Sequence, residues 1–327
     1  MPPILIIMIA LAIIFDFLNG IHDSSNIVAT MISSRAFSPR VALGVTAISH
    51  FIAPFIFGVA VATTIGHEVV ASEAITLNIL LAALSSAIIW NLLTWFFGIP
   101  SSSSHALIGG MIGAVAVGAG VNAIELAGMK KILIALFTSP IIGLLLGYFF
   151  TKLIFSLARG ATPKINIFFK RFQIISAIAL SLSHGTNDAQ KTMGIITLGL
   201  VTAGIIPDFK VPLWVITISA VAIALGTALG GWKLIKTLGG KFYKIRPVHG
   251  FSSQLTSAIV ILGASIVGGP VSTTQVVSSS IMGVGSAQRV KMVRWGVAKE
   301  IIVAWIITIP ITMVMAAGIY WLIEKLL

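Results

Sequence analysis

The sequence predicts an all-α polytopic membrane protein, built from two inverted-topology repeats whose broken or re-entrant helices meet at the membrane midplane. Three observations lead to this prediction: a very apolar composition, apolar stretches long enough to cross a bilayer, and polar motifs that occur twice in the same order. Of the 327 residues, 57% are hydrophobic and 9% are charged, whereas a soluble globular chain has roughly 25% charged residues.

Apolar segments of about 20 residues recur along the chain, and a helix of that length crosses the ~30 Å hydrocarbon core of a bilayer. The ~10-residue alternating segments of a membrane β-barrel are absent from the sequence. The first apolar segment has no basic leader and continues into polar residues, so we interpret it as a mature helix rather than a cleaved signal. The predicted spans lie at 4–18, 41–64, 75–97, 132–157, 211–231, 258–268 with its flanks, and 297–323.

The charge balance is strongly basic, with 21 Lys and Arg against 9 Asp and Glu and a formal net charge of +12. In a membrane protein this excess is typical of cytoplasmic loops that follow the positive-inside rule, so we expect no nucleic-acid partner. The chain contains no cysteine, which excludes a disulfide framework and thiolate chemistry.

Three sequence blocks occur twice, in the same order, and predict an internal duplication. The matching blocks are "GIHDSSN" at 20–26 with "GTNDAQK" at 185–191, "LGVTAIS" at 43–49 with "LWVITIS" at 213–219, and "GIPSSSSHALIGGMIG" at 98–113 with "GGPVSTTQVVSSSIMG" at 268–283.

The duplication divides the chain into halves of similar length. We predict a first repeat at 1–156, a cytoplasmic linker at 157–171 and a second repeat at 172–327. Under this division Asp23 matches Asp188, because both occupy the fourth position of the first motif.

The loop charges indicate that the two halves have opposite orientations. The loop 65–75 carries Glu68 and Glu73 and no basic residue, whereas its counterpart 231–249 carries five Lys and Arg residues. Because short loops rich in Lys and Arg stay cytoplasmic, the second half should be inverted relative to the first. Inverted repeats are common in secondary transporters. We therefore predict a multi-pass protein of the cell (inner) membrane with both termini extracytoplasmic.

Each repeat contains a predicted helix break deep in the membrane. Pro100 and Pro270 interrupt the helical pattern, and the Ser and Thr residues that follow are residue types that cap new helices. Helix N-termini bind anions through free N–H groups and the positive end of the macrodipole. The alternative, hydroxyls bonding back to their own helices or joining neighbouring helices, fits two symmetric clusters less well. The predicted anion-binding residues are Ser102, Ser103, Ser104, Ser272, Thr273 and Thr274.

Asp23 and Asp188 form the second predicted site. A carboxylate at the membrane centre costs roughly 2.5–3.5 kcal/mol on insertion scales, so two at matching positions indicate a use for the charge. Their neighbours are rich in amide and hydroxyl oxygens, which suit hard cations such as Na⁺. The alternative is an Asp188–Lys191 ion pair that only holds the fold. That pair leaves Asp23 unexplained, because Asn26 stands at the position that matches Lys191.

The motifs "GTNDAQKTMG" and "GPVSTTQ", each echoed in the first half, resemble the PiT family of inorganic phosphate transporters. The resemblance covers essentially the whole chain. It implies cation-coupled uptake of inorganic phosphate, usually with Na⁺ and in some members with H⁺, while certain bacterial relatives carry sulfate.

The resemblance also implies which residues form the two sites, and one position departs from it. The first-half motif of the family has Asn where this chain has His22, an imidazole that can ligate a cation or titrate near neutral pH. Our candidates for Na⁺ are Asp23, Asn26, Asn187, Asp188, His22 and Ser101, and our candidates for phosphate are the six residues of the helix breaks together with Ser25 and Gln190.

We therefore expect a Na⁺-coupled phosphate symporter that works by alternating access, with Na⁺ as coupling ion and no cofactor. The alternatives are an H⁺-coupled phosphate or sulfate permease of the same family and an anion channel. An intramembrane enzyme would need a serine nucleophile within reach of a base, and duplicated motifs fit a pseudo-symmetric binding site better. The expected partners are phosphate, Na⁺ and the lipid bilayer, and a homodimer is left open.

The basic stretch 230–246 has two predicted conformations. Its mixed basic and apolar spacing favours either an amphipathic helix on the cytoplasmic surface or a lysine-rich loop. His249 lies beside it, and we expect this residue to be solvated.

Overall fold

All regular secondary structure in the described residues, 1–67, 74–240 and 242–326, is helical in the computed structural model. Glu68 and Glu73, on which part of the orientation prediction rests, lie outside the described residues. The α-helices are α1 (Pro3–Ser33), α2 (Pro39–Phe57), α3 (Ala60–His67), α4 (Leu77–Phe97), α5 (Ser103–Gly118), α6 (Leu126–Leu157), α7 (Ile165–Thr202), α8 (Leu213–Leu229), α9 (Trp232–Gly240), α10 (Pro247–Ile266), α11 (Thr273–Gln288) and α12 (Trp295–Leu326).

Within the described residues, six helices are long and apolar enough to cross a membrane, namely α1, α2, α4, α6, α7 and α12. Helices α8 and α9 pass the same test together as a pair bent by 70°. The predicted all-α polytopic fold is therefore confirmed.

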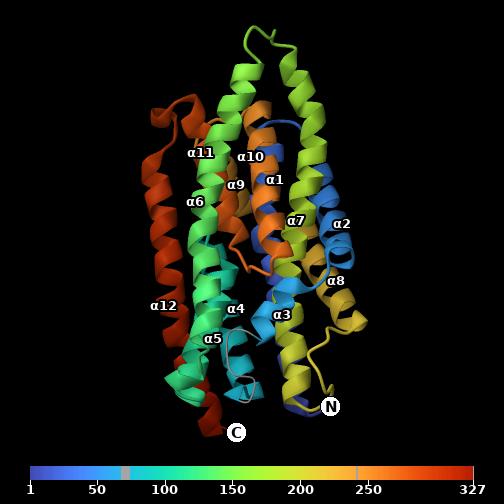
Figure 1. The fold of residues 1–327 in the computed structure, drawn as a ribbon, viewed down its shortest axis with the longest axis vertical. Coiled ribbons are helices and arrows are strands. Elements are labelled where there is room, and N and C mark those ends of the chain that lie inside the picture. Colours follow the sequence, from blue (N-terminus) through green and yellow to red (C-terminus); the bar gives the residue numbers. More distant parts are fainter. Residues whose placement is uncertain (68–73, 241, 327) are drawn as a thin grey trace.

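The two halves pack around each other in a reciprocal way. Helix α1 packs against α8 while its counterpart α7 packs against α2, and α5 packs against α12 while α11 packs against α6. Figure 1 shows both chain ends at one end of the molecule and the α6–α7 connection at the other. Each half therefore crosses the molecule an odd number of times, as inverted repeats require.

The connection between the halves is shorter than the predicted linker. Only residues 158–164 separate α6 from α7, so the segment 165–171 already belongs to α7.

Glycines allow the halves to approach closely at equivalent points. A Cβ added at Gly113 in α5 would collide with the backbone of Met313 in α12. A Cβ added at the matching Gly283 in α11 would collide with the backbone of Leu144 in α6. Small residues at such crossings are typical of membrane helix interfaces.

Both predicted helix breaks are present. Helix α4 ends at Phe97 before Gly98, which has a φ of 68°, and Gly268 has a φ of 73° at the matching break. Helices α5 and α11 have 16 residues each, so each rises only ~24 Å. Their first residues are buried, which places two helix N-termini inside the protein.

The first part of the basic stretch 230–246 is a helix, α9 at Trp232–Gly240, which packs against α1, whereas residues 242–246 are not helical. The expectation that His249 is solvated was wrong. Its side chain is 1% exposed, and its ring packs against Tyr243 and Phe155. Tyr243 in the segment after α9 and Phe155 in α6 cover this position, and the sequence pattern gave no sign of that cover.

Candidate ion and substrate site

Asp23 in α1 and Asp188 in α7 lie close together in the interior of the protein. Both side chains are fully buried. One carboxylate oxygen of each and a ring nitrogen of His184 lie within 4.8 Å of one another. The two matching carboxylates of the two halves therefore form one cluster.

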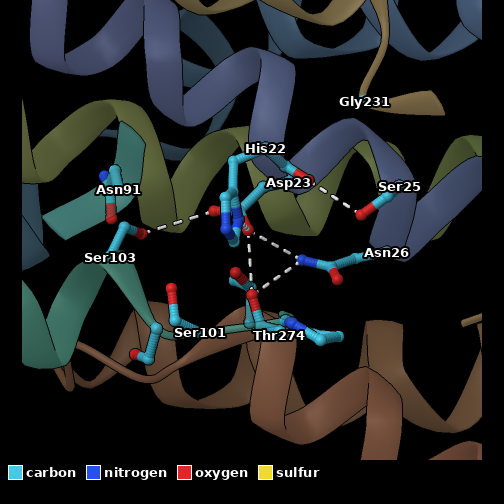
Figure 2. A network of polar contacts seen from close by, with 12 residues as sticks. His22, Asp23, Ser25, Asn26, Asn91, Ser101, Ser103, Gly231 and Thr274 are labelled. Carbon is cyan, nitrogen blue, oxygen red and sulfur yellow. Dashed lines mark hydrogen bonds and ion pairs between the residues drawn. The ribbon is translucent and has the colours of Figure 1, made fainter. Parts of the chain in front are cut away.

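The Asp23 carboxylate faces the starts of both short helices. Its Oδ1 accepts hydrogen bonds from Thr274 Oγ1 of α11 at 2.8 Å and from Asn26 Nδ2 at 2.9 Å. Its Oδ2 accepts a longer one from Ser103 Oγ of α5 at 3.4 Å. Figure 2 shows Asp23 between Ser103 and Thr274, with the His22 ring alongside and Nδ1 at 3.4 Å. The cation candidate of one half thus contacts the anion candidates of both halves.

The Asp188 carboxylate has different partners. Lys191 Nζ donates to its Oδ1, and Thr273 Oγ1 donates to its Oδ2 at 3.1 Å. His184 Nδ1 lies 2.7 Å from Oδ2, although the ring is not oriented for a hydrogen bond. Asp188 is therefore paired with a full positive charge. In the described part of the chain, no lysine or arginine pairs with Asp23.

The two helix N-termini are capped by equivalent serines. Ser102 Oγ accepts a hydrogen bond from the His105 N–H at 3.1 Å, and Ser272 Oγ accepts one from the Gln275 N–H at 3.3 Å. Each cap orders the first turn of its helix. The hydroxyls of Ser102 and Ser272 therefore bond to their own helices, as the alternative interpretation expected.

Ser104 joins the two breaks, because its Oγ donates to the Val271 carbonyl at 3.0 Å. Beside it lies a cavity of about 10 Å³ that Ser104, Lys191 and Pro270 line together with apolar side chains. A cavity of that size holds about one water. The site is therefore closed around the candidates, and a phosphate can enter only if the helices move.

Asn187 and Ser101, two of the predicted Na⁺ ligands, have hydrogen-bond partners outside the carboxylate cluster. Asn187 Nδ2 donates to Ser265 Oγ at 2.9 Å and to the Gly269 carbonyl at 3.3 Å, so it holds the break after α10. The hydroxyl of Ser101 bonds to that of Thr94 at 2.7 Å.

Ser25 and Gln190, which occupy matching positions, also have partners outside the carboxylate cluster. Ser25 Oγ donates to the His22 carbonyl of its own helix at 2.8 Å. Gln190 Oε1 accepts from the Val61 N–H at 2.7 Å at the start of α3, while its Nε2 has no hydrogen-bond partner. We therefore leave Ser25 out of the phosphate site that we propose below.

Three further polar residues lie near the cluster: Asn19 belongs to the amide neighbours of Asp23 noted in the sequence, whereas Asp16 and Thr192 were missed. Asp16 and Asn19 in α1 and Thr192 in α7 are fully buried, and their side-chain polar atoms form no hydrogen bond of normal geometry. Thr192 lies beside the Asp16 carboxylate. A carboxylate within a predicted span was itself a signal, because burying one in a membrane is costly.

Comparison with known proteins gives the family. The sequence model of the "Phosphate transporter family" matches residues 19–163 and 156–316. A Bacillus subtilis protein described as a "Probable low-affinity inorganic phosphate transporter" is 48% identical over 331 residues, covering 99% of this chain and 97% of that protein. A Rhizobium meliloti protein with the same description is 44% identical over 321 residues, covering 98% of this chain and 96% of that protein.

A solved structure has the same fold. It is described as "The sodium-dependent phosphate transporter", and it aligns with a TM-score of 0.92 and 26% sequence identity over 99% of this chain and 100% of that chain. The family and these relatives are transporters rather than enzymes. The resemblance inferred from the motifs is therefore confirmed: the chain belongs to the phosphate transporter family of multi-pass membrane proteins.

Proposed function

We propose that this protein is a symporter that couples the uptake of inorganic phosphate to Na⁺ by alternating access. The observation that carries the proposal is the position of Asp23, whose carboxylate contacts Ser103 and Thr274 at the starts of α5 and α11. A cation at Asp23 and an anion at these helix starts would share ligands. The description of the similar solved structure as sodium-dependent supports Na⁺ as the coupling ion.

Phosphate would bind between the N-termini of α5 and α11. Helix N-termini carry partial positive charge and free N–H donors, which favour phosphate groups. Hydroxyl donors there come from buried side chains that are each 2% exposed, namely Ser103, Ser104, Thr273 and Thr274. Ser102 and Ser272 would support the site by capping the two helices.

Na⁺ would bind beside Asp23. Asn26 and Asn187 each have a buried carboxamide oxygen without a hydrogen-bond partner, and such oxygens suit hard cations. Asp188 lies in the same cluster but is paired with the Lys191 ammonium, so Asp23 supplies the negative charge for the cation. His22 would tune this site through its contact with Asp23, while Ser101 would act only by holding the helix break.

Coupling follows from the cost of burying charge. An anion taken out of water is expensive to bury unless an opposite charge accompanies it, so the closed site forms readily only when cation and phosphate are both bound. The driving force is adequate, because a tenfold Na⁺ gradient supplies about 1.4 kcal/mol per ion. A membrane potential of 100 mV adds about 2.3 kcal/mol per net charge moved.

Proton coupling is the second candidate, and the histidines favour it. His22 lies beside Asp23 and His184 beside Asp188, and a histidine ring nitrogen can accept or donate a proton. A cation site with a histidine at each carboxylate could therefore load a proton in place of Na⁺.

The orientation and the division of the chain are part of the proposal. We place the connection 158–164 in the cytoplasm and both termini outside, in the cell (inner) membrane, because the basic residues of 157–171 follow the positive-inside rule. The repeats would comprise 1–156 and 172–327.

Uptake of ³²P-phosphate by proteoliposomes tests the proposal. We expect concentrative, saturable uptake with an inward Na⁺ gradient and little uptake when choline replaces Na⁺ at the same pH. Uptake driven only by an inward proton gradient would favour the second candidate. Equilibration without accumulation under either gradient would indicate a channel and contradict both.

A further inference from the structure

The surroundings of Asp23 and Asp188 share two matching contacts, and one of these contacts differs in charge. Ser103 and Thr273 are matching residues, and each donates a hydrogen bond to the carboxylate of its own half. The residue three positions after each aspartate also donates to that carboxylate. In the first half this residue is Asn26, at 2.9 Å, and in the second half it is Lys191. An ammonium group thus occupies the place of a neutral carboxamide.

Lys191 is buried and forms an ion pair with Asp188. Its side chain is 1% exposed, and lysine is almost never fully buried unless it is paired. Its ammonium is bonded to Asp188, whose second oxygen accepts from Thr273 with the His184 ring alongside. Both oxygens of Asp188 are engaged, and one of the partners is an ammonium group, so the charge of Asp188 is balanced without a mobile cation.

Lys191 also faces the substrate side of the site. Its side chain lines the small cavity together with Ser104 and Pro270. The Lys191 side chain therefore connects the Asp188 carboxylate, which its ammonium contacts, with a cavity beside the hydroxyls that we propose as phosphate ligands.

We propose that Lys191 is a tethered cation that permanently occupies the second-half cation position. The transport cycle then uses one mobile cation fewer than a site with Asn at both positions, and that mobile cation binds at Asp23. This inference rests on the proposed cation coupling and specifies its stoichiometry. The physical reason is charge equivalence, since a lysine ammonium neutralises Asp188 as Na⁺ would but is never released.

The inference predicts how the cycle responds to voltage. Monovalent phosphate accompanied by one mobile monovalent cation moves no net charge, so an inside-negative potential would not drive it. With a second mobile cation the same cycle would move one positive charge, and the potential would drive uptake.

Lys191→Asn is the direct test, because it places the first-half residue at the matching position. We supply ²²Na⁺ and ³²P-phosphate in the medium outside the proteoliposomes. We expect the ratio of Na⁺ to phosphate taken up to rise by one. Phosphate uptake by this variant should also become faster when valinomycin sets an inside-negative K⁺ diffusion potential. Lys191→Arg keeps the charge and should keep the wild-type ratio. An unchanged ratio and voltage response in Lys191→Asn would overturn the inference.

A reciprocal variant tests the same idea from the other half. Asn26→Lys places an ammonium beside Asp23, so we expect the ratio of Na⁺ to phosphate to fall by one. If this variant keeps the wild-type ratio, a lysine at that position does not replace a coupling ion, and the inference fails.

A binding measurement covers the case in which a variant folds but does not transport. Purified Lys191→Asn should bind one more ²²Na⁺ per molecule than the wild type at saturation. Equal stoichiometry would overturn the tethered cation. A wild-type protein whose uptake responds to neither Na⁺ nor H⁺ would instead overturn the proposed coupling, so the two failures are distinguishable.

Discussion

Thr274 Oγ1 donates a hydrogen bond of 2.8 Å to the carboxylate of Asp23, across a sequence separation of 251 residues. The bond joins the start of α11 to the middle of α1, so it links the second half to the first. Asn26 Nδ2 donates to the same hydroxyl oxygen at 2.9 Å, which closes a triangle of three side chains (Figure 2). A cation that binds Asp23 must therefore disturb a residue that we propose as a phosphate ligand.

Thr274→Val tests this link, because valine has nearly the same shape but no hydroxyl. Hydrogen bonds to charged groups contribute about 1.5–3 kcal/mol, so we expect the apparent affinity for Na⁺ in phosphate uptake to fall by about tenfold or more. Ser278→Ala is the matched control, since Ser278 is buried in the same helix and its hydroxyl has no hydrogen-bond partner. Equal Na⁺ affinities in Thr274→Val and the wild type would show that the link plays no part in coupling.

Asp23→Asn and Asp188→Asn should each severely reduce coupled phosphate uptake. The first removes the counter-charge of the mobile cation, and the second changes the charge of the cluster next to it. The measurement is ³²P-phosphate uptake against Na⁺ concentration in proteoliposomes. Wild-type Na⁺ dependence in both variants would exclude the carboxylates from the cation site.

The same two variants should differ in stability. Asp188→Asn leaves the buried ammonium of Lys191 without its partner, and breaking a buried ion pair costs about 3–5 kcal/mol. Asp23→Asn strands no lysine or arginine among the described residues and should unfold at a higher temperature than Asp188→Asn. Thermal unfolding of the purified proteins measures the difference. The reverse order would mean that Lys191 has another way to satisfy its charge.

Gly113→Ala and Gly283→Ala should destabilise the protein by similar amounts. In each case the new methyl group would collide with the backbone of a helix from the other half, and overpacking of this kind costs about 1–3 kcal/mol. Gly44→Ala in α2 is the control, because nothing lies within 4 Å of a Cβ added there. Thermal unfolding would contradict the reciprocal packing if only one of the two variants lost stability relative to the control.

The proposed orientation can be tested with single cysteines, since the chain contains none. Thr162 lies in the exposed connection between α6 and α7, and Asp208 lies in the exposed loop between α7 and α8. We expect an impermeant maleimide to label Asp208→Cys from outside intact cells and to label Thr162→Cys only after the membrane is opened. Labelling of Thr162→Cys in intact cells would reverse the orientation.

The sequence alone determined the membrane class, the duplication and the two helix breaks. These features are local, because composition decides which segments enter a bilayer and Pro100 and Pro270 stop a helix wherever the rest of the chain lies. The serine that follows each break caps the new helix for the same local reason, through an N–H three residues ahead.

Only the tertiary structure decided which side chains meet. A helix fixes the angles between its own residues, but its rotation against a neighbour depends on packing between segments far apart in the chain. That rotation brings Thr274 to the Asp23 carboxylate, and it directs the carboxamide oxygen of Gln190 to the start of α3. It also places the Lys191 ammonium within the carboxylate cluster of both halves, because α1 and α7 pack against each other there.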